Sequence, residues 1–69
     1  MKGDIESLLA QVRIEHKITQ EGLAQKVGVT RQTIIAVEKG NYTPSVLLAI
    51  RLAKYFKLPV EDLFKIKKP

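Results

Sequence analysis

The sequence predicts an all-α fold, a compact bundle of five short helices that forms a single domain over residues 1–69. Apolar residues recur three and four positions apart along most of the chain, as they do in helices with one buried face. Capping residues and glycines occur at intervals that suit five such helices. The tail FKIKKP alternates apolar and basic residues and is compatible with one short C-terminal edge strand.

The composition narrows the class of protein. The absence of cysteine excludes disulfides and thiolate metal sites. His16 is the only histidine, so we expect no metal site and no cofactor. No apolar run reaches the ~18 residues of a membrane span and the N-terminus lacks a signal-peptide core, which indicates a cytoplasmic protein with no membrane partner.

The charge points to a polyanionic partner without identifying it. The formal net charge is +5 and the isoelectric point is about 9.8, values that favour binding to nucleic acid or to an anionic surface. A lysine-rich solvated surface accounts for the charge equally well. The positions of the basic residues must therefore decide.

The first helix is predicted from its apolar spacing. Ile5, Leu8, Leu9 and Val12 follow the i, i+3, i+4, i+7 pattern of an amphipathic helix. Asp4 is the expected N-cap.

The second and third helices are predicted from their ends. Thr19 is an expected N-cap, and Gly28 ends the second helix because glycine accepts the left-handed conformation without steric cost. Thr30 is expected to cap a third helix that runs to Lys39 and ends at Gly40. The two helices and their short connection, residues 19–39, have the form of a helix-turn-helix motif.

The fourth helix is expected to begin with Thr43 as N-cap and Pro44 at the first helical position, and to reach about Phe56. The segment VEDLF indicates a short fifth helix. The inward stripe of the fourth helix comprises Leu48, Ala49, Leu52, Ala53 and Phe56.

The third helix carries two different faces. At ~100° per residue, Ile34 and Val37 share one side. The opposite arc contains Arg31, Gln32, Ile35, Ala36 and Lys39. Arginine pairs with guanine, glutamine with adenine, and apolar carbons contact the thymine methyl in the major groove of DNA. This arc therefore predicts a DNA-reading surface; the alternative is a solvated face with one stray isoleucine.

The segment ITQEGLAQKVGVTRQTIIAVEKGNYTPS, with the later LAIRLAKYFKLPVEDLF, resembles the Cro/lambda-repressor-type, or XRE-like, helix-turn-helix family. The resemblance extends from about Leu9 to Phe64 and implies a five-helix bundle whose third helix reads DNA. The base-reading positions implied by the motif and the helix face are Arg31, Gln32, Ile35 and Ala36. The positions implied to bind the phosphate backbone are Gln20, Thr30, Thr33, Lys39, Asn41 and Tyr42.

The resemblance implies two further roles. Gln20, at the start of the second helix, is expected to hold a phosphate and to help orient Arg31. Arg13 is expected to pair with Glu38 inside the domain; the alternative is two unrelated surface charges.

Four residues depart from the family pattern. Gly22 should cost the second helix up to ~1 kcal/mol relative to alanine. Lys17 and Lys57 occupy turn positions where glycine is common, so one or both are expected to have positive φ. Ile35 replaces a residue that is commonly small and polar, which affects which sequence is bound rather than whether DNA is bound.

Apolar residues outside the inward stripe predict a homodimer. Leu47 and Ile50 lie outside the stripe of the fourth helix, and exposed apolar surface on a small protein often marks an interface. The expected dimer interface comprises Leu47, Ile50, Phe64 and Ile66. Cover by the N-terminal helix is the alternative.

The sequence therefore predicts a dimeric, sequence-specific regulator of transcription that binds double-stranded DNA, with a repressor favoured over an activator. It predicts no enzyme, since Ser7 and Ser45 have no nearby base to activate them. An alternative is an antitoxin that binds a toxin protein and its own operator. A further alternative is a protein that binds nucleic acid without sequence preference.

Overall fold

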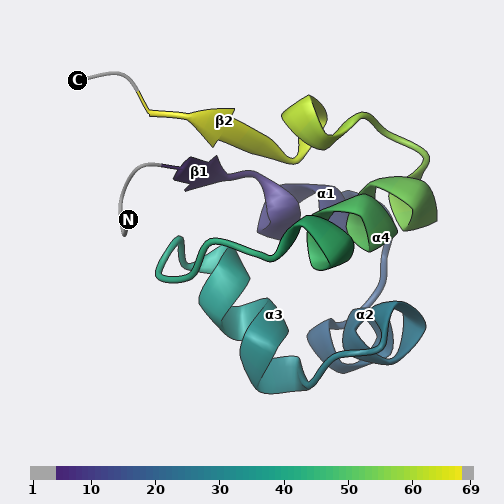
Figure 1. Cartoon of the computed structure of the whole chain (residues 1–69). Coiled ribbons are helices and arrows are strands. Elements are labelled where there is room, and N and C mark those ends of the chain that lie inside the picture. Colours follow the sequence, from purple (N-terminus) through teal and green to yellow (C-terminus); the bar gives the residue numbers. More distant parts are fainter. Residues whose placement is uncertain (1–4, 68–69) are drawn as a thin grey trace.

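The computed structural model describes residues 5–67. Figure 1 shows their elements along the chain. They are β1 (Ile5–Ser7), α1 (Leu9–Glu15), α2 (Gln20–Val27), α3 (Arg31–Glu38), α4 (Val46–Phe56), the 3-10 turn η1 (Val60–Asp62) and β2 (Phe64–Ile66). The helix α4 lies between the α2–α3 pair and the C-terminal segment (Figure 1).

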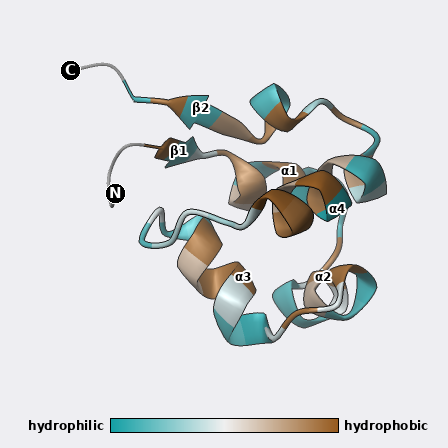
Figure 2. Ribbon diagram, viewed as in Figure 1, coloured by the Kyte–Doolittle hydropathy of each residue, from teal (hydrophilic) through white to brown (hydrophobic). Residues whose placement is uncertain are grey.

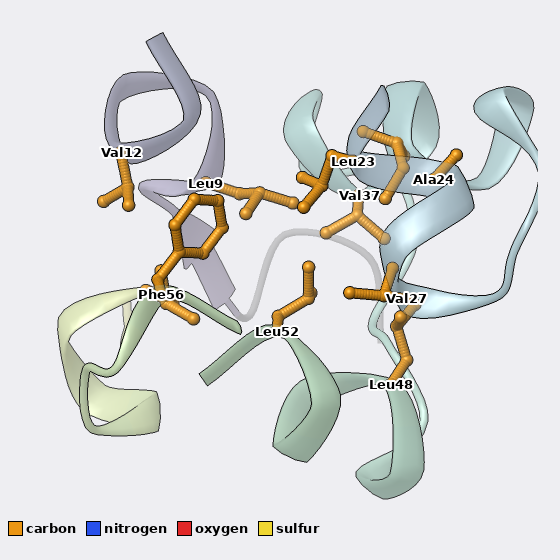
Figure 3. Packing of buried hydrophobic residues seen from close by; sticks show 11 residues of the cluster. Leu9, Val12, Leu23, Ala24, Val27, Val37, Leu48, Leu52 and Phe56 are labelled. Atoms are coloured by element: carbon orange, nitrogen blue, oxygen red, sulfur yellow. The ribbon is translucent and has the colours of Figure 1, made fainter. Parts of the chain in front are cut away.

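One apolar core joins all four α-helices and η1's neighbour Leu63. The buried residues are Leu9, Val12, Leu23, Ala24, Val27, Ile34, Val37, Leu48, Leu52, Phe56 and Leu63. Figure 3 shows side chains from α1, α2, α3 and α4 converging on this cluster. Ala24 is almost fully buried where α2 packs against α3, and its small side chain allows the two helices to approach closely.

The local signals that define α2 and α3 are confirmed. The Thr19 hydroxyl accepts a hydrogen bond from the Gly22 N–H at 2.9 Å, and the Thr30 hydroxyl accepts one from the Thr33 N–H at 3.3 Å. Gly28 ends α2 with φ of 78°, in the left-handed region. These contacts fix where α2 begins and ends and where α3 begins.

The expectation that Ile5 belongs to the first helix is wrong. Residues Ile5–Ser7 form β1, which pairs antiparallel with β2, and α1 begins at Leu9. The chain enters α1 already bonded to the tail, because the Leu8 N–H donates to the Leu63 carbonyl at 2.8 Å. The predicted N-cap Asp4 lies outside the described residues.

The predicted start of the fourth helix is also wrong. The N-cap of α4 is Ser45, whose hydroxyl accepts a hydrogen bond from the Leu48 N–H at 3.1 Å. Thr43 and Pro44 therefore precede the helix instead of capping and opening it. In sequence, both Thr43 and Ser45 offer a capping hydroxyl, and only the latter is in register with the first turn.

The C-terminal segment differs from the predicted fifth helix. Residues Val60–Asp62 form a three-residue 3-10 turn, so the described residues contain four α-helices rather than five. The chain then extends into β2, which confirms the short C-terminal strand. In the two-stranded sheet Ile5 lies opposite Ile66 and Ser7 lies opposite Phe64.

Three of the four residues that depart from the family pattern have a structural account. Lys17 and Lys57 have φ of 56° and 58°, as expected for the left-handed turns after α1 and α4. A Cβ atom at Gly22 would lie 3.0 Å from the Thr19 hydroxyl oxygen and 3.2 Å from Ile18 Cγ1. A side chain at this position would crowd the cap of α2, which explains a glycine within the helix.

Candidate nucleic-acid interface

The outward side of α3 presents polar side chains to solvent. Arg31, Gln32 and Lys39, the last at the helix end, are exposed, while Ile35 and Ala36 are half-buried. Glu38 is the only acidic residue of α3, and it is turned toward α1. The outward side is therefore positively charged and has free hydrogen-bonding groups, as a surface that contacts DNA requires.

The inner side of α3 fixes this orientation. Ile34 is fully buried and Val37 almost fully buried. Because both residues are held in the core, α3 cannot rotate about its axis without exposing them to water. The outward set named from the helical period is therefore the set that the packing leaves accessible.

A network of polar groups lies between α1 and α3, and we call it the polar junction. Arg13 Nε lies 2.6 Å from Glu38 Oε2, and the two side chains are only 14% and 7% exposed. Arg13 Nη1 also donates to the Ile18 carbonyl at 3.0 Å, and Gln20 Nε2 donates to Glu38 Oε1 at 3.0 Å. The polar junction thus joins α1, the start of α2 and the end of α3.

Gln20 faces into the polar junction. Its amide donates to Glu38, and within residues 5–67 the structure shows no hydrogen bond between Gln20 and Arg31. Gln20 therefore helps to orient Glu38, and its expected role in orienting Arg31 stays a prediction. Its position at the N-terminus of α2 remains compatible with a phosphate contact.

The other residues expected at the DNA backbone lie around the ends of α3. Thr30 and Thr33 are at its N-terminus, and their hydroxyl oxygens are 3.1 Å apart. Asn41 and Tyr42 are exposed in the connector between α3 and α4. Apart from Gln20 at the start of α2, the residues expected to bind the backbone therefore lie in α3 or next to its ends.

The residues expected at a dimer interface fall into two groups. Leu47 and Ile50 are 59% and 44% exposed on α4, and Ile66 is 84% exposed at the end of β2. Phe64 is half-buried and packs against the core, so less of its side chain is available to a partner.

One exposed apolar residue next to the expected interface was not predicted from the sequence. Val46, beside Leu47, is 76% exposed. The apolar run Val46–Ile50 was the signal that could have identified it, and Figure 2 shows hydrophobic colour along most of α4.

The described residues were also searched for membrane-spanning helices and for metal sites. No helix within residues 5–67 has the length and hydropathy needed to cross a bilayer. Across the same residues, no three histidine or carboxylate side chains gather closely enough to share a metal ion.

Residues 9–63 match the helix-turn-helix family. A helix-turn-helix transcriptional regulator of Methanocaldococcus jannaschii is 55% identical over 56 residues, which cover 81% of this chain and 85% of the relative. The helix-turn-helix transcriptional regulator YgzD of Bacillus subtilis is 48% identical over 54 residues, covering 78% of this chain and 82% of YgzD.

A more distant relative is the transcriptional repressor RstR of the cryptic phage CTXphi from Vibrio cholerae. It is 33% identical over 57 residues, which cover 83% of this chain and 51% of RstR. None of these three relatives is named as an antitoxin, so the toxin-binding alternative gains no support from them. The chain belongs to the XRE-type helix-turn-helix family of transcriptional regulators.

Proposed function

We propose that the chain is a homodimeric repressor that binds a two-fold symmetric operator through α3. The observation that carries this proposal is the outward side of α3, where Arg31, Gln32 and Lys39 are exposed and no carboxylate is present. Helices of this kind enter the major groove and read base edges with side chains near their N-termini.

Four residues of α3 are proposed to read the bases. Arg31 and Gln32 lie in the first turn, where side chains reach the bases, and they suit guanine and adenine respectively. Ile35 and Ala36 offer carbon surface to the same bases.

The residues that bind the phosphate backbone are Gln20, Thr30, Thr33, Lys39, Asn41 and Tyr42. Because phosphate contacts carry no sequence information, these residues position the helix while the first group selects the site.

Dimerisation would place two reading helices on successive major grooves, about 34 Å apart. The exposed side chains of Leu47, Ile50 and Ile66 support an interface, since a monomer would leave this apolar surface in water. Phe64 would contribute the part of its side chain that the core leaves exposed.

A small dimer on a promoter would repress transcription by excluding the polymerase, and the name of the relative RstR supports repression. Access to the chromosome would place the protein in the cytoplasm.

In vitro selection of bound duplexes tests the proposal. Starting from random double-stranded DNA, the purified chain should select two copies of one short half-site in inverted orientation. Selection of a single unrepeated site would contradict the dimer, and recovery of sequences with no shared motif would contradict sequence-specific binding. Titration of selected and scrambled duplexes at one salt concentration then gives the specificity ratio.

A substitution in α4 tests the interface. Leu47→Glu should give a folded monomer that binds the selected operator much more weakly, because a charge cannot be buried without a partner. Sedimentation velocity measures the assembly state, and circular dichroism confirms folding. Ile14→Glu, at an exposed position of α1, is the matched control and should remain dimeric. An unaltered dimer in Leu47→Glu, or a monomeric wild type at high concentration, would contradict this interface.

A further inference from the structure

The outward side of α3 carries a hollow whose walls come from two segments of the chain. Gln32, Thr33 and Ala36 contribute from the helix, and Tyr42 contributes from the connector. Thr33 and Ala36 are half-buried, while Gln32 and Tyr42 are exposed, and we call these two exposed residues the rim of the hollow. The hollow therefore opens on the side of α3 that the proposed function assigns to DNA.

The walls of the hollow are mostly carbon. Ala36 contributes a methyl group and Tyr42 contributes an aromatic ring. The hydroxyl of Thr33 lies 3.1 Å from the hydroxyl of Thr30, an interaction that draws the polar atom of Thr33 toward the N-terminus of α3. The methyl group of Thr33 then remains for the hollow. The amide of Gln32 is the polar group at its rim.

Tyr42 is held beside α3 by its own connector. Gly40 turns the chain with φ of 76°, and the Asn41 N–H donates to the Ala36 carbonyl at 3.2 Å. On its other side the connector borders a small cavity, which Tyr42 lines together with Ile5 and Phe64 of the two-stranded sheet. The turn at Gly40 and the hydrogen bond of Asn41 hold the backbone of the connector against α3, which places Tyr42 at the border of the hollow.

We infer that this hollow receives the 5-methyl group of a thymine, an inference that rests on the proposed function. The thymine methyl is the apolar group that base edges present in the major groove, so a carbon-walled hollow on a reading helix fits it. The amide at the rim suits the N6 and N7 atoms of an adenine. Together, Gln32 and the hollow select a site rich in A·T pairs at this position.

The inference changes the roles of two residues. Tyr42 contacts a base through its ring instead of binding a phosphate through its hydroxyl. Ile35, which lies beside the hollow and does not line it, is not the contact for the methyl group.

Uracil substitution tests the inference directly, because uracil lacks only the 5-methyl group. In the selected operator, each thymine of both half-sites is replaced in turn by uracil, and affinity is measured by fluorescence anisotropy. The wild type should lose about fourfold in affinity per half-site at one position, as expected for one methyl group returned to water. Equal affinity for thymine and uracil at every position would overturn the inference, while preference for the selected operator would leave the proposed function standing.

Two substitutions of Tyr42 separate the ring from the hydroxyl. Tyr42→Ala should abolish the difference between thymine and uracil, whereas Tyr42→Phe should retain it. If the Tyr42 hydroxyl instead binds a phosphate, Tyr42→Phe should lower the affinity for every duplex. Tyr42→Ala should then leave the thymine–uracil ratio unchanged.

Ile35→Ser tests the neighbouring apolar residue of α3 and should preserve the thymine–uracil ratio, even where it changes the affinity for all duplexes. Loss of that ratio in Ile35→Ser but not in Tyr42→Ala would place the methyl group on Ile35 and overturn the inference. Wild-type protein that shows no preference for any duplex would overturn the proposed function and this inference with it. Circular dichroism melting confirms that each variant is folded.

Discussion

The polar junction and the outward side of α3 use similar side chains for opposite purposes. In the polar junction, the guanidinium of Arg13 has a carboxylate and a carbonyl as partners, and the amide of Gln20 bonds to the same carboxylate. On the outward side, the guanidinium of Arg31 and the amide of Gln32 are exposed to water. One pair of polar groups is satisfied within the fold, and the other is left accessible.

This difference separates stability from recognition. Groups in the polar junction are largely removed from water, so the loss of one leaves its partners without hydrogen bonds and destabilises the fold. Groups on the outward side are hydrated, so their loss should barely alter stability and should appear only when DNA is present. Substitutions in the two regions therefore test whether stability and recognition are separate.

The largest effect is expected at the centre of the polar junction. Glu38→Ala would strand Arg13 without its carboxylate, and removing one partner of a buried ion pair typically costs ~3–5 kcal/mol. That loss is a large share of the stability of a small domain. Chemical denaturation without DNA measures it.

Glu15→Ala, at an exposed position of α1, is the matched control and should change stability little. If Glu38→Ala melts at the same temperature as the wild type, the polar junction does not stabilise the fold.

The next effect belongs to the outward side. Arg31→Ala should cost ~1–3 kcal/mol on the selected operator and relax the preference at one base pair of each half-site. Its melting temperature should match that of the wild type, because Arg31 is exposed. Titration of matched and single-substitution duplexes measures both quantities.

Lys54→Ala removes the same charge from α4 and should leave the base preference intact. If Arg31→Ala weakens binding equally on all sequences, α3 is not the reading helix.

Gln20 belongs to the polar junction and is also expected to touch a phosphate, so it should show both kinds of effect. Gln20→Ala should destabilise the fold by ~1.5 kcal/mol, the lower end for a hydrogen bond to a charged group, because the residue is half-buried. It should also weaken binding to all duplexes similarly. Gln25→Ala, an exposed glutamine of the same helix, is the control. A variant that changes stability alone would confine Gln20 to the polar junction.

The smallest effect is expected at the end of α3. Lys39→Ala should leave stability unchanged and weaken all duplexes by the same factor, since a phosphate contact carries no sequence information. The slope of log K against log salt should fall by about one unit per lost contact. Binding measured at four or more salt concentrations gives the slope. An unchanged slope would remove Lys39 from the backbone contacts.

The parts of the fold that the sequence predicted correctly depend on local signals. Thr19, Thr30 and Gly28 act on backbone groups within a few residues of themselves, so their roles are visible in the sequence alone. The positions of Ile34 and Val37 follow from the helical period. The helix-turn-helix and its outward face were therefore predictable.

The predictions were wrong where the local structure depends on a residue far away in the sequence or on a choice between two similar residues. Ile5 satisfies the helical spacing of α1, but its segment pairs with residues near the other end of the chain. Thr43 and Ser45 both carry a capping hydroxyl, and spatial register selects Ser45.

The candidate site shows the same limit. The hydrogen bond between Gln20 and Glu38 joins residues that no local pattern connects, and the place of Tyr42 beside Ala36 depends on how the connector folds back. The helical period gave the face of α3, but it could not give the shape of the surface that the connector adds to it.

The pairing of β1 with β2 also sets the order in which the molecule can open. Because Ile5 lies opposite Ile66, forming the sheet closes a loop of roughly 60 residues, whereas α2 and α3 contact each other across a short turn. Each strand has only three residues, and two-stranded sheets are marginally stable on their own. Amide hydrogens in the strands should therefore exchange with solvent sooner than those of α2. Since the connector and the sheet share the walls of a small cavity, such an opening would expose this side of the connector, while the hydrogen bond from the Asn41 N–H to the Ala36 carbonyl still holds it to α3.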